Sequence, residues 1–137
     1  MKCAVSVFTA LTVGAVSTAG FAQLDYFNPR AAMQIAGEQV FAMRCAVCHA
    51  QEAGAHSIGP SLRGVVGRRA GSVAGFSYSA ALKKSGLTWT EDNLRKWIAD
   101  PSGTVAGTLM PHVSLRDSAE QLYVIAYLRS LKTEAVQ

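Results

Sequence analysis

Five consecutive residues, Cys45-Ala46-Val47-Cys48-His49, constrain this chain more than any other part of its sequence. Two thiols three positions apart, followed at once by an imidazole, form the attachment pattern of a c-type haem. The thiols can add to the two vinyl groups of the haem, and one short turn then holds His49 beside the iron as its proximal ligand. The pattern therefore predicts one covalent haem c with its iron, attached through Cys45 and Cys48 and ligated by His49.

Other uses of a CxxC pattern fit this sequence poorly. A structural zinc site needs four ligands in tetrahedral geometry, whereas the chain after residue 22 has two cysteines and three histidines, and Cys48 and His49 are adjacent. A thioredoxin-like dithiol accompanies alternating strands and helices, and no convincing strand is predicted here. Haem attachment is therefore the preferred interpretation of the motif.

The first 22 residues have the features of a secretory signal peptide. Lys2 supplies the positive start, an apolar run extends over residues 4–19, and Gly20-Phe21-Ala22 offers small residues where signal peptidase cleaves. A retained membrane anchor is the alternative, but threonines, serines and a glycine interrupt the run and no charged stop follows it. We expect cleavage after Ala22, export to a bacterial periplasm and no stable membrane insertion afterwards.

The rest of the chain is expected to form one domain. This domain is expected over residues 31–133, after a leader over residues 23–30 and before a tail over residues 134–137. Removal of residues 1–22 takes away one lysine and no acid, so the formal net charge falls from +4 to +3, and the basic residues are dispersed. This charge argues against a nucleic-acid partner.

Apolar periodicity and capping residues predict an all-α fold. Three main helices are expected over residues 31–44, 91–99 and 118–132, with a short helical stretch over residues 76–84. Asp100-Pro101 is expected to end the second main helix. The segments over residues 50–75 and 102–115 lack sustained periodicity and are predicted to be loops.

These residues and spacings resemble class I cytochrome c, in the mitochondrial-type branch with bacterial c2-like and c550-like members. The resemblance covers nearly all of the chain after the signal segment. It implies an all-α class I cytochrome c fold, with three main helices plus short helices and loops wrapped around one covalent haem. After His49, it rests on Gly59-Pro60-Ser61-Leu62-Arg63-Gly64, Gly75-Phe76-Ser77-Tyr78, Gly86-Leu87-Thr88-Trp89 and Gly107-Thr108-Leu109-Met110.

The resemblance also implies roles for residues outside the motif. The Pro60 carbonyl would accept a hydrogen bond from the ring of His49, which orients the ring and raises its basicity. Gly37 and Phe41 would cross the last helix at Val124 and Tyr127. The residues that the resemblance assigns to the haem propionates are Arg68, Tyr78, Trp89 and Thr108.

Met110 would supply the sixth iron ligand by the same resemblance. It lies in a Gly/Pro-rich loop 61 residues after His49, where the sequence alone leaves a buried core methionine as the alternative. His112 is the rival ligand. His56 is too close in sequence to His49 to reach the opposite side of the iron, and is expected to be a solvated loop histidine.

An iron with two protein ligands leaves no position for a substrate, so the expected function is electron transfer rather than catalysis. We expect a soluble, monomeric, periplasmic one-electron carrier. Its expected donors are a periplasmic dehydrogenase or a quinol-oxidising complex, and its acceptors a terminal oxidase or a peroxidase. The alternatives are a dedicated haem c subunit held on one periplasmic dehydrogenase and, as a third class, a five-coordinate haem enzyme or gas sensor.

The chain also departs from the family pattern near the predicted sixth ligand. Ser102, Gly103 and Leu109 stand where the resemblance leads one to expect lysines of a basic docking ring. Electrostatic steering towards an acidic partner is therefore expected to be weaker and less sensitive to salt.

Overall fold

A computed structural model describes residues 28–110 and 115–132 of the chain. Within these residues there are helices and loops but no strand, apart from an isolated bridge between Arg69 and Thr88. The predicted all-α fold is confirmed, while the predicted signal segment and C-terminal tail lie outside the described residues. The helices are α1 (Pro29–Arg44), α2 (Ala80–Lys84), α3 (Glu91–Ala99), α4 (Pro101–Thr104) and α5 (Ser118–Ser130).

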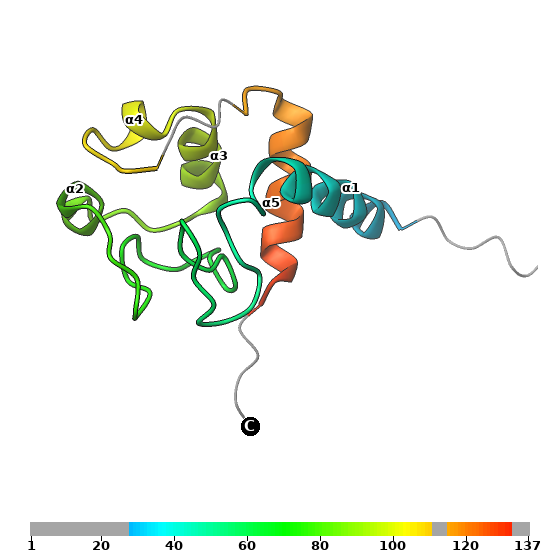
Figure 1. Cartoon of the computed structure of the whole chain (residues 1–137). Coiled ribbons are helices and arrows are strands. Elements are labelled where there is room, and N and C mark those ends of the chain that lie inside the picture. Colours follow the sequence, from blue (N-terminus) through cyan, green and yellow to red (C-terminus); the bar gives the residue numbers. More distant parts are fainter. Residues whose placement is uncertain (1–27, 111–114, 133–137) are drawn as a thin grey trace, which may run out of the picture.

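The closest packing between helices is the crossing of α1 with α5 (Figure 1). Gly37 is buried in the middle of α1, where a Cβ atom would overlap the carbonyl of Tyr123 and lie 2.8 Å from the Cβ of Tyr127. One turn later Phe41 is fully buried, and its ring centroid lies 5.4 Å from that of Tyr127. Glycine costs helix stability, but here it alone lets the two backbones come so close. The predicted crossing of Gly37 and Phe41 over Tyr127 is confirmed.

Two consecutive caps make the corner between α3 and α4. The Thr90 hydroxyl accepts a hydrogen bond from the Asn93 backbone N–H at 3.2 Å and so begins α3. Asp100 ends α3, and its Oδ1 accepts from the Gly103 N–H at 2.9 Å. Pro101 therefore begins α4, because a proline at the first helical position loses no hydrogen bond. The prediction that a loop starts at Ser102 was wrong for residues 102–104.

The short helix α2 begins later than predicted. Its first residue is Ala80 rather than Phe76, because the hydroxyl of Ser79 accepts from the Leu82 N–H at 3.2 Å and acts as the N-cap. Phe76 instead makes edge-to-face contact with Tyr78, with ring centroids 4.8 Å apart. The aromatic residues of this stretch therefore belong to a loop that packs on itself.

The core joins the helices to the loops that follow the cysteine motif. Trp89 and Trp97 are both buried, with ring centroids 5.1 Å apart, and they pack with residues of α5. At the surface, Arg129 of α5 lies 3.0 Å from Glu91 of α3. None of the helices in the described ranges is long and apolar enough to cross a membrane.

The Gly37 crossing leads to a first prediction. Gly37→Ala should lower the free energy of unfolding by about 3 kcal/mol, because the added methyl group forces α1 and α5 apart. Guanidinium unfolding of the haem-loaded protein, followed by tryptophan fluorescence, measures this loss. Gln39→Ala is the control, since its exposed site on the same helix should change stability by no more than about 0.5 kcal/mol. Equal effects of the two substitutions would contradict the role given to the crossing.

Candidate haem site

The cysteine motif continues directly from α1. The backbone N–H groups of Cys45 and Ala46 both donate to the Phe41 carbonyl, at 2.8 and 2.9 Å. Those of Cys48 and His49 then donate to the Cys45 carbonyl, at 3.0 and 2.9 Å. The motif is thus one tight turn at the end of α1, whose inner face is buried at Gly37, Val40 and Phe41, and that turn fixes the backbone from which both thiols and the imidazole extend.

Both thiols are free and half-buried. Burial raises the pKa of Cys45 to about 11, and the neighbouring Cys48 thiol adds to this effect although Arg44 opposes it. Cys45 is therefore an uncharged thiol at neutral pH. An uncharged side chain suits contact with an apolar group such as the rim of a macrocycle.

The ring of His49 is oriented by a backbone carbonyl. Its Nδ1 lies 2.7 Å from the carbonyl oxygen of Pro60, and because a carbonyl can only accept, the proton is on Nδ1. Burial lowers the pKa of His49 by more than the hydrogen bond to Pro60 raises it. The imidazole is therefore neutral, and its Nε2 carries the lone pair that a metal ligand needs.

Gly59 was not assigned a role from the sequence, yet it shapes the seat of the His49 ring. A Cβ atom at Gly59 would overlap the ring's Cε1 and lie 2.7 Å from its Nδ1. The Gly59 N–H also donates to the Cys48 carbonyl at 2.7 Å, so the loop returns against the motif. The glycine beside Pro60 was visible in the sequence, but which ring it faces depends on how this loop folds back.

His56 was predicted to be a solvated loop histidine, and that prediction was wrong. Its Nδ1 accepts from the Ser61 N–H at 3.1 Å, and its Nε2 donates to the Ala74 carbonyl at 2.9 Å. Its ring also makes edge-to-face contact with Phe76, with centroids 5.7 Å apart. The half-buried ring therefore joins two segments of the loop region, at Ser61 and Ala74, which are 13 residues apart, and holds the one that carries Pro60.

Met110 is half-buried and packs against the core. Its backbone N–H donates to the hydroxyl of Thr108 at 3.2 Å, which shapes the turn that presents the methionine. Thr108, assigned to the propionates by resemblance, thus has a local backbone partner in the structure. His112, the rival ligand, lies outside the described residues.

Arg68 and Tyr78, two of the residues assigned to the propionates, lie close enough to interact electrostatically. The half-buried guanidinium of Arg68 donates to the carbonyls of Arg63 and Ser61, at 2.8 and 3.2 Å. These two bonds use two of its five N–H donors and fix its orientation. Burial lowers the pKa of Arg68, although proximity to Tyr78 opposes this.

The donor set fits a haem better than a bare ion. Among the described residues, no group of three or more His, Cys, Asp or Glu side chains lies close enough to hold a metal. A tetrahedral zinc site would need such a group. The side chains that do suit iron are one neutral imidazole and one thioether, and a macrocycle would provide the remaining four nitrogens. The two free thiols beside the imidazole are the groups that covalent attachment of a c-type haem requires.

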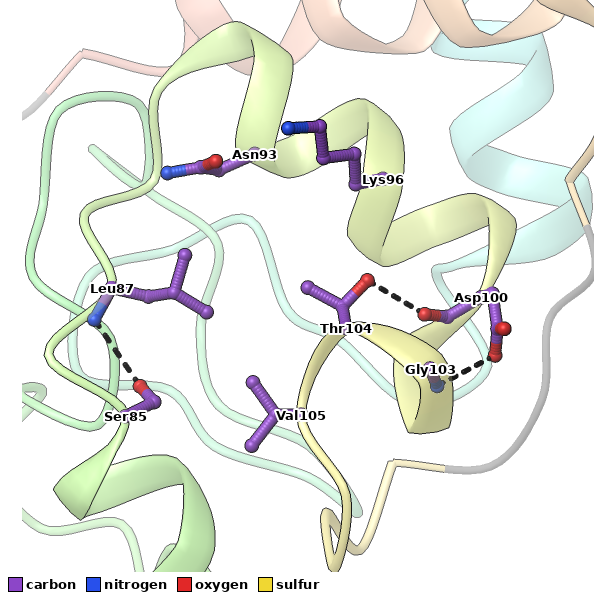
Figure 2. Close-up of a pocket in the computed structure, with 8 residues that line it drawn as sticks. All are labelled: Ser85, Leu87, Asn93, Lys96, Asp100, Gly103, Thr104 and Val105. Carbon is purple, nitrogen blue, oxygen red and sulfur yellow. Dashed lines mark hydrogen bonds between the residues drawn. The ribbon is translucent and has the colours of Figure 1, made fainter.

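A surface cavity of about 700 Å³ lies between α3, α4 and the segment after α2 (Figure 2). None of the predicted site residues lines it. Its polar side chains already serve the fold: Ser85 accepts from the Leu87 N–H at 3.3 Å, Asn93 donates to a loop carbonyl at 2.8 Å, and Thr104 donates to the Asp100 carbonyl at 2.7 Å. With these groups occupied, the cavity is a weak candidate for a ligand site.

Comparisons with known proteins identify the family of this chain. Residues 34–132 match the family described as cytochrome c. The chain is similar to cytochrome c2 iso-2 of Magnetospirillum fulvum, at 51% identity over 87 residues, which cover 64% of this chain and 91% of that protein. It is also similar to cytochrome c2 of Blastochloris viridis, at 42% identity over 108 residues, covering 77% and 84%. Among solved structures, cytochrome cH from Methylobacterium extorquens superimposes with a TM-score of 0.66 at 43% identity, covering 71% of this chain and 97% of that one.

The loop-joining role of His56 can be tested by His56→Phe. This substitution keeps an aromatic ring beside Phe76 but removes both hydrogen bonds to the loops, so it should lower the free energy of unfolding by about 2 kcal/mol. Denaturant titration of the haem-loaded protein measures the loss. Phe76→Leu, which removes the ring contact and keeps both hydrogen bonds, should cost less; a larger loss there would show that the rings and not the hydrogen bonds hold the loops.

A third prediction concerns alkaline pH. Burial raises the pKa of the Tyr78 hydroxyl by more than Arg68 and the backbone hydrogen bond to Val73 lower it. The unfolded chain therefore loses this proton first, and stability falls as the pH rises above about 10, the ordinary tyrosine value. Tyr78→Phe should flatten that fall, as measured by denaturant unfolding at several alkaline pH values. Tyr127, whose pKa burial also raises, leaves part of the slope in the variant. Parallel curves for the variant and the wild type would contradict the assignment.

Proposed function

Because this chain belongs to the cytochrome c family, we propose that it is a periplasmic one-electron carrier whose haem iron is bound by His49 and Met110. As a cytochrome c it carries one covalent haem c and transfers electrons rather than acting as an enzyme. The proposal adds the periplasmic location and the two axial ligands to what family membership shows. The observation that supports His49 as the proximal ligand is the 2.7 Å contact between its Nδ1 and the Pro60 carbonyl, which leaves Nε2 for the iron.

The proposed ligands suit a carrier for chemical reasons. When bound, the haem supplies a single Fe(III)/Fe(II) couple. The Pro60 carbonyl increases the basicity of His49 and prevents its ring from rotating. The thioether of Met110 is a soft ligand that favours the ferrous state and so raises the potential. Two axial ligands held by a packed core also limit rearrangement between the two oxidation states.

The remaining site residues would hold the propionates. Arg68 is held in position by two loop carbonyls, and it still has N–H donors for a carboxylate. Tyr78 lies within its electrostatic reach, and Trp89 brings an indole N–H that needs a partner when buried. Carboxylates that leave water need such charge-assisted partners. Thr108 would act mainly by accepting the Met110 N–H and so shaping the turn that presents the methionine.

The location and partners are proposed from the sequence. The signal-like residues 1–22 and the need to attach haem after export support a bacterial periplasm. The proposed donors are a periplasmic dehydrogenase or a quinol-oxidising complex, and the proposed acceptors are a terminal oxidase or a peroxidase. A haem subunit bound permanently to one dehydrogenase is the second candidate, favoured by the scarcity of charge around the site. Co-purification of a stoichiometric partner from periplasmic extract would support this candidate over a free carrier.

Met110→Ala tests the ligand assignment. The oxidised variant should lose the weak far-red absorption band of the sulfur–iron bond, and the reduced variant should bind carbon monoxide. Its reduction potential should fall by on the order of 100 mV, a modest part of the ~0.8 V over which axial ligands set haem potentials. Optical spectra and a mediated redox titration measure these changes.

His112→Ala and Met33→Ala are the matched controls. Both variants should keep the far-red band and exclude carbon monoxide, because neither removes the proposed ligand. If His112→Ala opened the iron to carbon monoxide while Met110→Ala did not, the sixth ligand would be histidine. The carrier assignment would still stand, but the argument about potential would not.

A further inference from the structure

The most exposed aliphatic side chains in the described part of the protein lie next to residues of the haem site in the sequence. Six large hydrophobic residues are exposed in the whole described part of the protein, and the three most exposed are Leu109 at 79%, Val47 at 74% and Ile58 at 73%. Val47 lies between the two cysteines, Ile58 precedes Gly59 beneath the His49 ring, and Leu109 precedes Met110. We call these three residues the aliphatic rim.

The loops that carry the aliphatic rim are nearly without charge. Residues 45–62 and 101–110 together contain one formally charged residue, Glu52, whereas charged residues make up 16% of the whole chain. The other exposed positions in these loops are small or weakly polar, such as Ala53, Ser57 and Ser102. Both histidines of the first loop are engaged by backbone carbonyls. Arg44, which is exposed, directly precedes Cys45, so a partner that approaches this part of the surface meets two isolated charges of opposite sign, Arg44 and Glu52, on otherwise uncharged loops.

Exposed apolar groups beside an electron-transfer site have a physical consequence. Burial of their surface against a partner is favourable by about 25 cal/mol per Å², and it needs no complementary charge. An acidic ring on the partner would gain little Coulomb energy here and would lose part of its hydration. The rim therefore favours a partner surface that is itself apolar.

We propose that the aliphatic rim is the docking surface for the redox partner, and that the partner's facing surface is apolar and close to uncharged. This inference rests on the proposed carrier function and specifies the partner of the same site. The contact is small, short-lived and of the low-area class typical of redox encounters. Its rate depends weakly on ionic strength, because screening acts on charge pairs that this interface lacks.

The test uses the haem-loaded protein and two synthetic surfaces as probes. Gold coated with a mixed methyl- and hydroxyl-terminated monolayer represents an apolar neutral partner, and a carboxylate-terminated monolayer represents an acidic one. Surface plasmon resonance measures how much protein adsorbs, and voltammetry measures the electron-transfer rate, each at about 10 mM and about 300 mM salt, conditions that shorten the screening length several-fold.

The wild type should adsorb and exchange electrons on the neutral monolayer, with rates that differ by less than about twofold between the two salt concentrations. Leu109→Lys should lower adsorption and rate there by about tenfold, through lost burial and an added charge, and should gain activity on the carboxylate monolayer at low salt. Ile58→Lys should act in the same direction.

Ile35→Lys is the matched control. Ile35 is 62% exposed on α1 and lies ten residues before the motif, so the variant carries the same added charge away from the rim and should behave like the wild type. The proposal is overturned if the wild type exchanges electrons only on the carboxylate monolayer, or if Ile35→Lys has the effect of Leu109→Lys. It is also overturned if sedimentation shows a dimer that Leu109→Lys dissociates, because the rim would then bind a second copy.

Failure of the carrier function itself would be visible before any surface is used. A mediated redox titration in solution would then show no reversible one-electron couple. A reversible couple in solution together with electron transfer confined to the carboxylate monolayer would leave the carrier function in place and reject only the apolar partner.

Discussion

The close crossing of α1 and α5 is the constraint on which the rest of the structure depends. Gly37 lets the backbone of α1 approach Tyr123 and Tyr127, and the direction of α1 then determines where the cysteine motif begins. The Phe41 carbonyl, one turn further along, accepts the first two N–H groups of that motif. A packing contact on one side of the protein thereby positions two thiols and an imidazole on the other.

The loops of this protein are held by backbone and side-chain hydrogen bonds rather than by a sheet. Buried backbone polar groups need partners, and here His56 and Arg68 supply several of them. His56 reaches Ala74, 18 residues away, and the other three bonds are to residues five to seven positions away. The return of Gly59 against Cys48 adds a direct backbone bond at 2.7 Å. The same bonds that satisfy the loops orient Pro60 and hence His49, so the stability of the loops and the geometry of the ligand are coupled.

Charge is distributed in a way that matches a carrier with an apolar docking surface. Seven of the twelve lysines and arginines among the described residues lie on helices, while residues 45–62 and 101–110, beside His49 and Met110, carry a single charged side chain. Most of the charge, and with it solubility, therefore lies outside these two segments, with Arg44 at the end of α1 as the nearest cation to the cysteine motif. An uncharged surrounding also keeps the local dielectric low, which favours the ferrous state of a haem iron held there.

The sequence by itself determined the haem motif, the main helices and most of their caps, because these depend on residues a few positions apart. Asn28 and Thr90 cap helices through contacts within one turn, whereas the Ser79 cap was missed and the start of α2 was placed four residues too early. Only the tertiary structure decided that His56 joins two loops, that Gly59 faces the His49 ring and that Leu109 is the most exposed of the large hydrophobic residues described. Those properties depend on contacts between segments distant in the chain, which local propensity and periodicity do not encode.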